Sequence, residues 1–220
     1  SGTLTNGVAK KYGLCEIITA DIIRHEVAKR SERALALARL ISEGQLVPRS
    51  ILVELIALKM LAQLSNNKGF IVSGFPRELS ESELFDREIR PPDLVLYLNV
   101  RDSVLSDRIM SRSVKETERM SINFDHIKSM INDFHKRNKP IIKYYDQVLV
   151  MIDAEHDTLT VFEAVCQAID PVLVNFPGFN IVIASTSNCT NASAQKNTNA
   201  NVSSATNATT SKSDNTKVKK

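Results

Sequence analysis

The stretch Gly69–Arg77, GFIVSGFPR, decides how the rest of this sequence is interpreted. Its apolar run from Phe70 to Val72, bounded by glycines, is typical of a buried strand in a parallel sheet. Gly74 follows that run, and a glycine lets a ligand approach the main chain closely. Arg77 closes the stretch, and a guanidinium group suits a phosphate held by two hydrogen bonds. The pattern indicates an anion site at the carboxyl end of a strand; the alternative is a structural turn followed by a surface arginine.

Strand and helix patterns alternate on both sides of this stretch. Strands are predicted at 14–18, 70–73, 94–100 and 148–152, and helices at 20–29, 32–43, 50–62, 80–89, 102–112, 125–145 and 158–169. This alternation predicts βαβ units, an α/β fold with a parallel sheet, and ligands bound at the carboxyl ends of the strands.

The composition excludes several classes of protein. The chain has 220 residues and a net charge of +3 spread over both signs, which argues against nucleic acid or a membrane surface as partner. No run of 18 apolar residues and no signal peptide are present. Cys15, Cys166 and Cys189 are too widely spaced for a disulfide framework or a zinc motif, which favours a reducing compartment, the cytoplasm. The four histidines share no ligand-like spacing, so no metal site built from protein ligands is predicted.

The composition changes near Pro171, where Asn, Ser, Thr and Ala become dominant. We therefore expect one folded domain over residues 1–172 and a low-complexity, disordered tail over 173–220. One segment of this tail, NIVIA at 180–184, nevertheless has the pattern of a strand.

The order of the motifs resembles the adenylate kinase family of nucleoside monophosphate kinases. The similarity runs from residue 1 to about 170 and is carried by ITADIIRHEV (18–27), EGQLVP (43–48), GFIVSGFPRE (69–78), RIMSR (108–112), KPIIKYY (139–145) and DAEHDTLTVFEAVC (153–166). It implies a three-layer α/β/α fold of the P-loop NTPase type, with a mobile monophosphate-binding subdomain at 18–47 and a lid flap at 111–123. It also implies Mg²⁺-dependent phosphoryl transfer, ATP + AMP to 2 ADP.

The resemblance also implies roles for individual residues. The residues expected to bind AMP are Thr19, Arg24, Gly44, Val47, Gly74 and Arg77, and those expected to bind ATP are Gly2, Thr3, Arg108 and Arg112. The arginines expected to act in catalysis are Arg77, Arg112 and Arg119. A threonine at the position of Thr19 favours AMP over pyrimidine monophosphates in the family; its alternative role is to cap a helix that begins at Ala20. For each of these arginines the alternative to a binding role is a solvent-exposed position on the surface of a helix.

Several positions depart from the family pattern. Ser73 stands where the family has an aspartate that orders the water ligands of Mg²⁺, and Glu81 stands where a glutamine reads the adenine of the acceptor. Met130 replaces a lid arginine, and the paired lid aspartates fall at Ser121 and Ile122. The family's first strand and glycine-rich phosphate loop are largely missing, because ungapped alignment places Ser1 at the loop lysine.

These departures leave three functions open. The chain is an adenylate kinase of impaired activity, or a pseudokinase that binds AMP or partners an active kinase domain. Because Glu81 breaks the adenine-reading pattern, a kinase for another monophosphate is the third possibility. A tandem kinase domain of the same parent protein is a further candidate partner.

The predicted sheet is one strand short of the family's five, and the absent one is central. A sheet without its central strand has two buried edges whose main-chain groups lack partners. The segment Ile181–Ala184 is the spare candidate: it fills the central position, or it resembles the opening strand of a following kinase domain.

Overall fold

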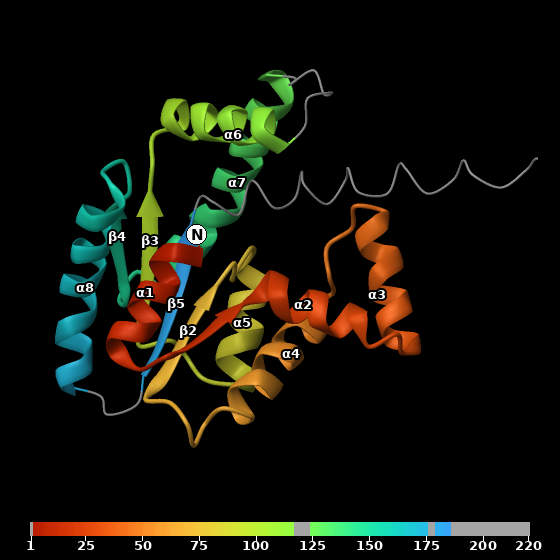
Figure 1. Cartoon of the computed structure of the whole chain (residues 1–220), viewed down its shortest axis with the longest axis horizontal. Helices are drawn as coiled ribbons and strands as arrows, with labels where there is room; N and C mark the ends of the chain where they lie inside the picture. Colours follow the sequence, from red (N-terminus) through yellow and green to blue (C-terminus); the bar gives the residue numbers. More distant parts are fainter. Residues whose placement is uncertain (1, 117–123, 176–178, 186–220) are drawn as a thin grey trace, which may run out of the picture.

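The computed structural model describes residues 2–116, 124–175 and 179–185. Strands and helices alternate within these ranges, as the sequence predicts (Figure 1). In chain order the elements are α1 (Gly2–Tyr12), β1 (Cys15–Ile18), α2 (Thr19–Ala28), α3 (Glu32–Ser42), α4 (Arg49–Leu61), β2 (Gly69–Ser73), α5 (Leu79–Glu88), β3 (Leu94–Asn99), α6 (Asp102–Glu116), α7 (Phe124–Tyr144), β4 (Leu149–Asp153), α8 (Thr158–Asn175) and β5 (Phe179–Ser185).

The strands of the described residues form one five-stranded sheet in the order β1-β2-β5-β3-β4. Every neighbouring pair is parallel, so the carboxyl ends of all the strands lie at the same edge of the sheet. The fold is therefore mixed α/β with a parallel sheet, as predicted.

The centre of the sheet is occupied by β5, which comes from the segment that the composition assigns to the tail. Val182 pairs with Val72 of β2 on one side and with Val95 of β3 on the other, and its side chain is 1% exposed. The strand thus takes the central position, as the first of the two alternatives for Ile181–Ala184 predicts. Residue 172, the expected end of the folded domain, lies inside α8, which continues to Asn175. The sheet also includes β5, since the inner edges of β2 and β3 both pair with it. Residues 186–220, the rest of the predicted tail, lie outside the described residues.

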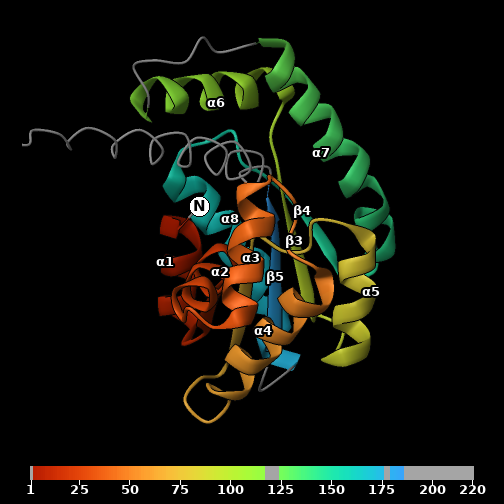
Figure 2. The ribbon, with the colours of Figure 1, turned by 90° about the vertical axis from the view of Figure 1, so that its right-hand side faces the viewer.

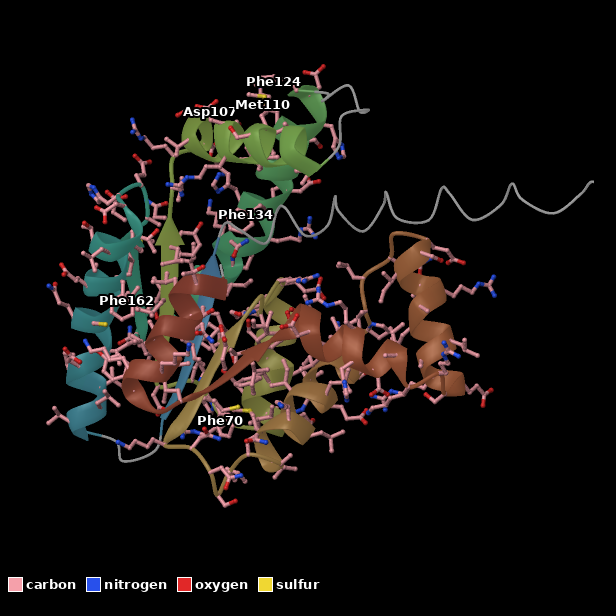
Figure 3. All side chains as sticks on the ribbon, viewed as in Figure 1. Phe70, Asp107, Met110, Phe124, Phe134 and Phe162 are labelled. Carbon is pink, nitrogen blue, oxygen red and sulfur yellow. The ribbon has the colours of Figure 1, made fainter. Side chains whose placement is uncertain are left out.

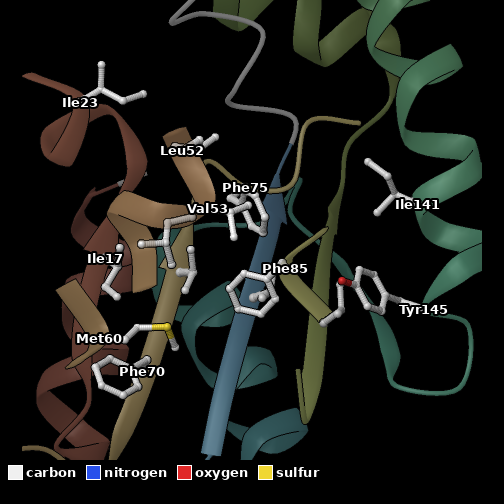
Figure 4. Close-up of a cluster of buried hydrophobic side chains, with 14 residues drawn as sticks. Ile17, Ile23, Leu52, Val53, Met60, Phe70, Phe75, Phe85, Ile141 and Tyr145 are labelled. Carbon is white, nitrogen blue, oxygen red and sulfur yellow. The ribbon is translucent and has the colours of Figure 1, made fainter. Parts of the chain in front are cut away.

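Helices cover both faces of the sheet, and side chains of β2 alternate between them. Ile71 faces α1 and α8, where it joins a buried cluster with residues such as Leu96 and Val165. Phe70 and Val72 point to the opposite face and pack with residues of α4, α5 and α7, among them Val53, Phe85 and Ile141 (Figure 4). The arrangement is the predicted three-layer sandwich.

Two pairs of helices extend away from the sandwich. The predicted monophosphate subdomain, 18–47, contains α2 and α3, which project to one side of the sheet (Figure 1). Helix α6 and the beginning of α7 project beyond the carboxyl end of β3 (Figure 2), with Met110 and Phe124 at the outer end of this pair (Figure 3). A third apolar cluster, which includes Tyr97, Ile109 and Ile131, holds this pair to the sheet.

Helix α6 is longer than the sequence predicts. It continues to Glu116, so the first part of the predicted lid flap, 111–123, is helical. Residues 113–116 contain no glycine or proline that would end the helix. Residues 117–123 lie outside the described ranges. No helix within those ranges is both long enough and apolar enough to cross a bilayer.

Candidate active site

The turn that follows β2 brings together three of the residues predicted to bind AMP. Gly74 has a φ of 79°, a left-handed conformation that favours glycine. Its carbonyl oxygen accepts a hydrogen bond of 3.1 Å from Oγ1 of Thr19 and another of 3.3 Å from Nε of Arg77. Thr19, Gly74 and Arg77 therefore form one constellation, which we call the Gly74 clamp.

Thr19 does not cap α2. The helix begins at Thr19 itself, its N-cap residue is Ile18, and no side chain caps it. The Thr19 side chain is 1% exposed and its hydroxyl points to Gly74. The alternative, that Thr19 caps a helix beginning at Ala20, is therefore wrong, because β1 leads directly into α2 and places the hydroxyl against the turn after β2.

Arg77 is half-buried beside this turn. Burial lowers the pKa of its guanidinium group, and the charge of Arg137 on α7 acts in the same direction. Within the described part of the chain, the Nε atom is bound to Gly74 while the two Nη atoms have no protein acceptor. Two donors of a planar guanidinium are thus left for an anion with two oxygens, which is the geometry that phosphate offers.

Glu81, which stands at the position of the family's glutamine, contacts the main chain of the clamp. Its Oε2 accepts a hydrogen bond of 2.6 Å from the main-chain N–H of Arg77, and the residue is 4% exposed. Burial raises the pKa of Glu81, against the opposing effects of the Arg77 N–H and the Arg77 charge. This contact was not predicted from the sequence. A signal for it exists, since Glu81 is an acidic residue in the first turn of α5, where carboxylates reach back to preceding N–H groups.

The other residues expected at the AMP site lie on the α2–α3 extension. Arg24 forms an ion pair with Asp21, and its side chain is 72% exposed. Gly44 has a φ of 72° and lies just after α3, and Val47 packs against the apolar cluster beneath α4. The structure brings Thr19, Gly74 and Arg77 into contact, whereas it gives Arg24 a partner on its own helix.

The residues expected to bind ATP lie around the carboxyl edge of the sheet. Gly2 and Thr3 form the first turn of α1, a position where main-chain N–H groups attract anions. Arg108 of α6 donates a hydrogen bond of 3.1 Å from Nη2 to the carbonyl oxygen of Ala154, just after β4. Arg112 belongs to α6, but its side chain and the whole of Arg119 lie outside the described residues.

An ion pair supports the loop that contacts Arg108. Arg101 donates from its main-chain N–H and from its guanidinium to the carboxylate of Glu155, at distances of 2.7 to 2.9 Å. These contacts lower the pKa of Glu155 to about 2. The pair ties the end of β3 to the loop after β4, and it too was not predicted.

The described residues do not fit a protein-bound Mg²⁺ ion. Ser73 is the last residue of β2 and is 7% exposed, and it offers a neutral hydroxyl where the resemblance implies a carboxylate. Carboxylates are the ligands or water acceptors that Mg²⁺ prefers. Within residues 2–116, 124–175 and 179–185, no group of three or more His, Cys, Asp and Glu side chains could hold a metal ion.

A second position of the family pattern is apolar here. Met130, at the place of a lid arginine, is partly buried and packs against the cluster between α6, α7 and β3. The positions of the paired lid aspartates, Ser121 and Ile122, lie outside the described residues.

Known proteins match most of this chain. Residues 1–150 match the family model described as "Adenylate kinase". The chain is 31% identical to "Adenylate kinase isoenzyme 1" of Rattus norvegicus over 171 residues, which are 77% of this chain and 88% of the relative. The human protein of the same name is 30% identical over the same shares. The chain is also 32% identical to "Adenylate kinase isoenzyme 5" of Mus musculus over 78% of its own length, but only 31% of that relative. Together with the parallel sheet and the clamp at its carboxyl edge, these matches show that the chain belongs to the adenylate kinase family of nucleoside monophosphate kinases.

Proposed function

We propose that this chain binds AMP at the Gly74 clamp and catalyses the family reaction, ATP + AMP to 2 ADP, at a strongly reduced rate. One observation carries the proposal: Thr19 and Arg77 converge on the carbonyl oxygen of Gly74 and leave the Nη atoms of Arg77 available for a phosphate. A half-buried guanidinium binds an anion more strongly than a solvated one, because less water competes for it.

The donor nucleotide would lie at the same carboxyl edge of the sheet as the Gly74 clamp. We place its phosphates near the first turn of α1, at Gly2 and Thr3, and near Arg108 and Arg112 of α6. Arg77, Arg112 and Arg119 would stabilise the charge of the phosphoryl group during transfer, since such reactions depend on positioning and electrostatic stabilisation. Because Ser73 does not supply the protein side of a Mg²⁺ site, no step is assigned to the metal.

The expected loss of rate follows from the substituted positions. A hydrogen bond to a charged group contributes about 1.5–3 kcal/mol, which corresponds to about 10- to 100-fold in rate for each lost transition-state contact. Ser73 and Met130 each replace one charged group. The two losses need not add, because residues that act together do not contribute independently.

A second candidate is a pseudokinase that binds AMP without turnover, or that supports an active kinase domain. It is favoured by Met130, because an apolar side chain packed among helices cannot approach a phosphate. Its partner would be a tandem kinase domain of the same parent protein; the chain spans 31% of the length of isoenzyme 5.

A third candidate is a kinase for another monophosphate. Glu81 supports it, since its Oε2 is bound to the main chain of Arg77 and no glutamine amide is present to read adenine. We also keep the cytoplasm as the proposed compartment, consistent with the free thiols of Cys15 and Cys166.

Two measurements on the full chain separate these candidates. Calorimetry with AMP, GMP, CMP and UMP identifies the acceptor, and a coupled assay of ADP formation with ATP measures turnover. We expect AMP to bind and Arg77→Ala to weaken it by about tenfold or more, the value of one charged hydrogen bond. Arg87→Ala is the matched control, because Arg87 is an exposed arginine of the adjacent helix α5 and pairs with Glu88.

The outcomes are distinct. Slow ADP formation that Arg77→Ala abolishes supports the kinase, and AMP binding without turnover supports the pseudokinase. Tighter binding of another monophosphate supports the third candidate. AMP affinity that is the same in Arg77→Ala and in the parent chain would contradict the assignment of the Gly74 clamp.

A further inference from the structure

Glu81 places a carboxylate directly behind the phosphate clamp. The Oε2 atom lies 2.6 Å from the main-chain nitrogen of Arg77, four residues earlier, and the side chain is almost completely buried. A buried carboxylate is costly unless it is paired or hydrogen-bonded. Here the larger compensating effects come from Arg77, the residue whose side chain closes the clamp, and a smaller one comes from the main chain of Glu78.

The charges around this pair are few. Among the described residues, those that act on Glu81 are Arg77 and Glu78 in the same turn, and those that act on Arg77 are Glu81 and Arg137 of α7. Arg77 favours the charged form of Glu81, whereas the charge of Glu78 opposes it and a main-chain hydrogen bond from Glu78 favours it. Glu81 is therefore the anion that most directly offsets the positive charge of the Arg77 guanidinium.

We propose that Glu81 is a positioning residue that sets the strength of the Gly74 clamp: its carboxylate fixes the main chain of Arg77 and at the same time weakens the attraction of Arg77 for phosphate. The inference rests on the proposed function, since it assumes that the clamp binds the acceptor phosphate. The second effect arises because Glu81 carries a negative charge, whereas the glutamine of the family pattern is neutral at this position.

The two effects of Glu81 respond differently to protonation. A protonated carboxyl group keeps an oxygen that accepts the Arg77 N–H, but it no longer opposes an anion. Burial, which raises the pKa of Glu81, brings this neutral form closer to physiological pH. Anion binding and proton binding are then coupled, and the coupling is reciprocal: an anion in the clamp makes Glu81 take up a proton.

Substitutions separate the two effects. Glu81→Gln keeps a hydrogen-bond acceptor of the same length and removes the charge, whereas Glu81→Ala removes both. Glu83→Gln is the matched control, because Glu83 is an exposed glutamate of the same helix. Inorganic sulfate is the first probe, since its charge does not change between about pH 5 and pH 8, and AMP is the second.

Calorimetry on the full chain gives the decisive numbers. In the parent chain we expect sulfate to bind more tightly as the pH falls and to take up protons, measured in two buffers of different ionisation enthalpy. Glu81→Gln should bind sulfate about three- to tenfold more tightly at pH 8, with no proton uptake from this site. Glu81→Ala should lose affinity relative to Glu81→Gln, because Arg77 is no longer held.

Other results overturn the inference. Glu81→Gln with the affinity, pH profile and proton uptake of the parent chain, or with weaker binding, shows that the charge has no such effect. If in that case Arg77→Ala still abolishes sulfate binding, the Gly74 clamp stands and the inference alone fails. If Arg77→Ala binds sulfate and AMP as the parent chain does, the clamp itself is wrong, and the inference falls with the proposed function.

Discussion

The hydroxyl group of Thr19 donates a hydrogen bond of 3.1 Å to the carbonyl oxygen of Gly74. The bond joins the first residue of α2 to the turn after β2. Because Nε of Arg77 donates to the same oxygen, the position of α2 and the position of the Gly74 clamp depend on one carbonyl group. A substitution of Thr19 should therefore change both the stability of the fold and the affinity of the Gly74 clamp for its ligand.

Replacing Thr19 with valine removes the hydroxyl and keeps the shape of the side chain. We expect the free energy of unfolding to fall by about 1 kcal/mol. This is near the lower end of the cost of leaving a buried acceptor without a partner, because Arg77 still donates to the carbonyl oxygen of Gly74. AMP affinity should fall as well. Urea unfolding and calorimetry measure the two effects. Thr19→Ser retains the hydroxyl and should stay close to the parent chain; a Thr19→Val variant of unchanged stability and affinity would show that the bond has no role.

The centre of the sheet can be tested with two valines. Val182 of β5 is 1% exposed, so Val182→Ala should lower the free energy of unfolding by about 1.5–3 kcal/mol. Val174 of α8 is 86% exposed, and Val174→Ala should change the free energy of unfolding by less than about 0.5 kcal/mol. Thermal or urea unfolding provides the comparison. Equal effects of the two substitutions would contradict the placement of β5 between β2 and β3.

The sequence predicted local features well and distant ones less well. The strand and turn of Gly69–Arg77 were predicted correctly, because apolar runs, glycine and proline act within a few residues. The sequence leaves two alternatives for the position of β5, since a short apolar segment does not reveal which strands it will pair with. The hydrogen bond between Glu81 and the main chain of Arg77 is not predicted from the sequence. The resemblance aligns positions along the chain, but it does not give the orientation of a substituted side chain.

Glu81 also makes a prediction for stability against pH. Its pKa in the folded chain is raised above the ordinary value of 4.5, so the folded state binds the proton more tightly than the unfolded state. The charged form is thus destabilising at high pH, and stability is regained as the pH falls through the raised pKa towards 4.5. Glu81→Gln should therefore be more stable than the parent chain at pH 8, and the difference should shrink at pH 5. Urea midpoints at the two pH values test this; a difference that grows on acidification would contradict it.

The pair between Arg101 and Glu155 offers a test by NMR. The pKa of Glu155 is lowered to about 2, chiefly by the side chain of Arg101. Arg101→Gln should let this pKa rise towards 4.5, but not fully, because the main-chain N–H of Arg101 still donates to the carboxylate. Asp157 is an internal control, since its lowered pKa comes from Thr160 and should not move. An unchanged titration of Glu155 in the variant would show that the ion pair is absent in solution.

The place of β5 has a consequence for how the chain is made. Among the described strands, the one in the middle of the sheet is the last to leave the ribosome. Until residues 179–185 emerge, a nascent chain would carry β1 and β2 in one half and β3 and β4 in the other, with the inner edges of both halves open. Contacts between segments so distant in sequence form slowly, and open strand edges invite pairing with other chains. We therefore expect this protein to complete its fold only after synthesis has passed residue 185, and to depend on chaperones during that interval.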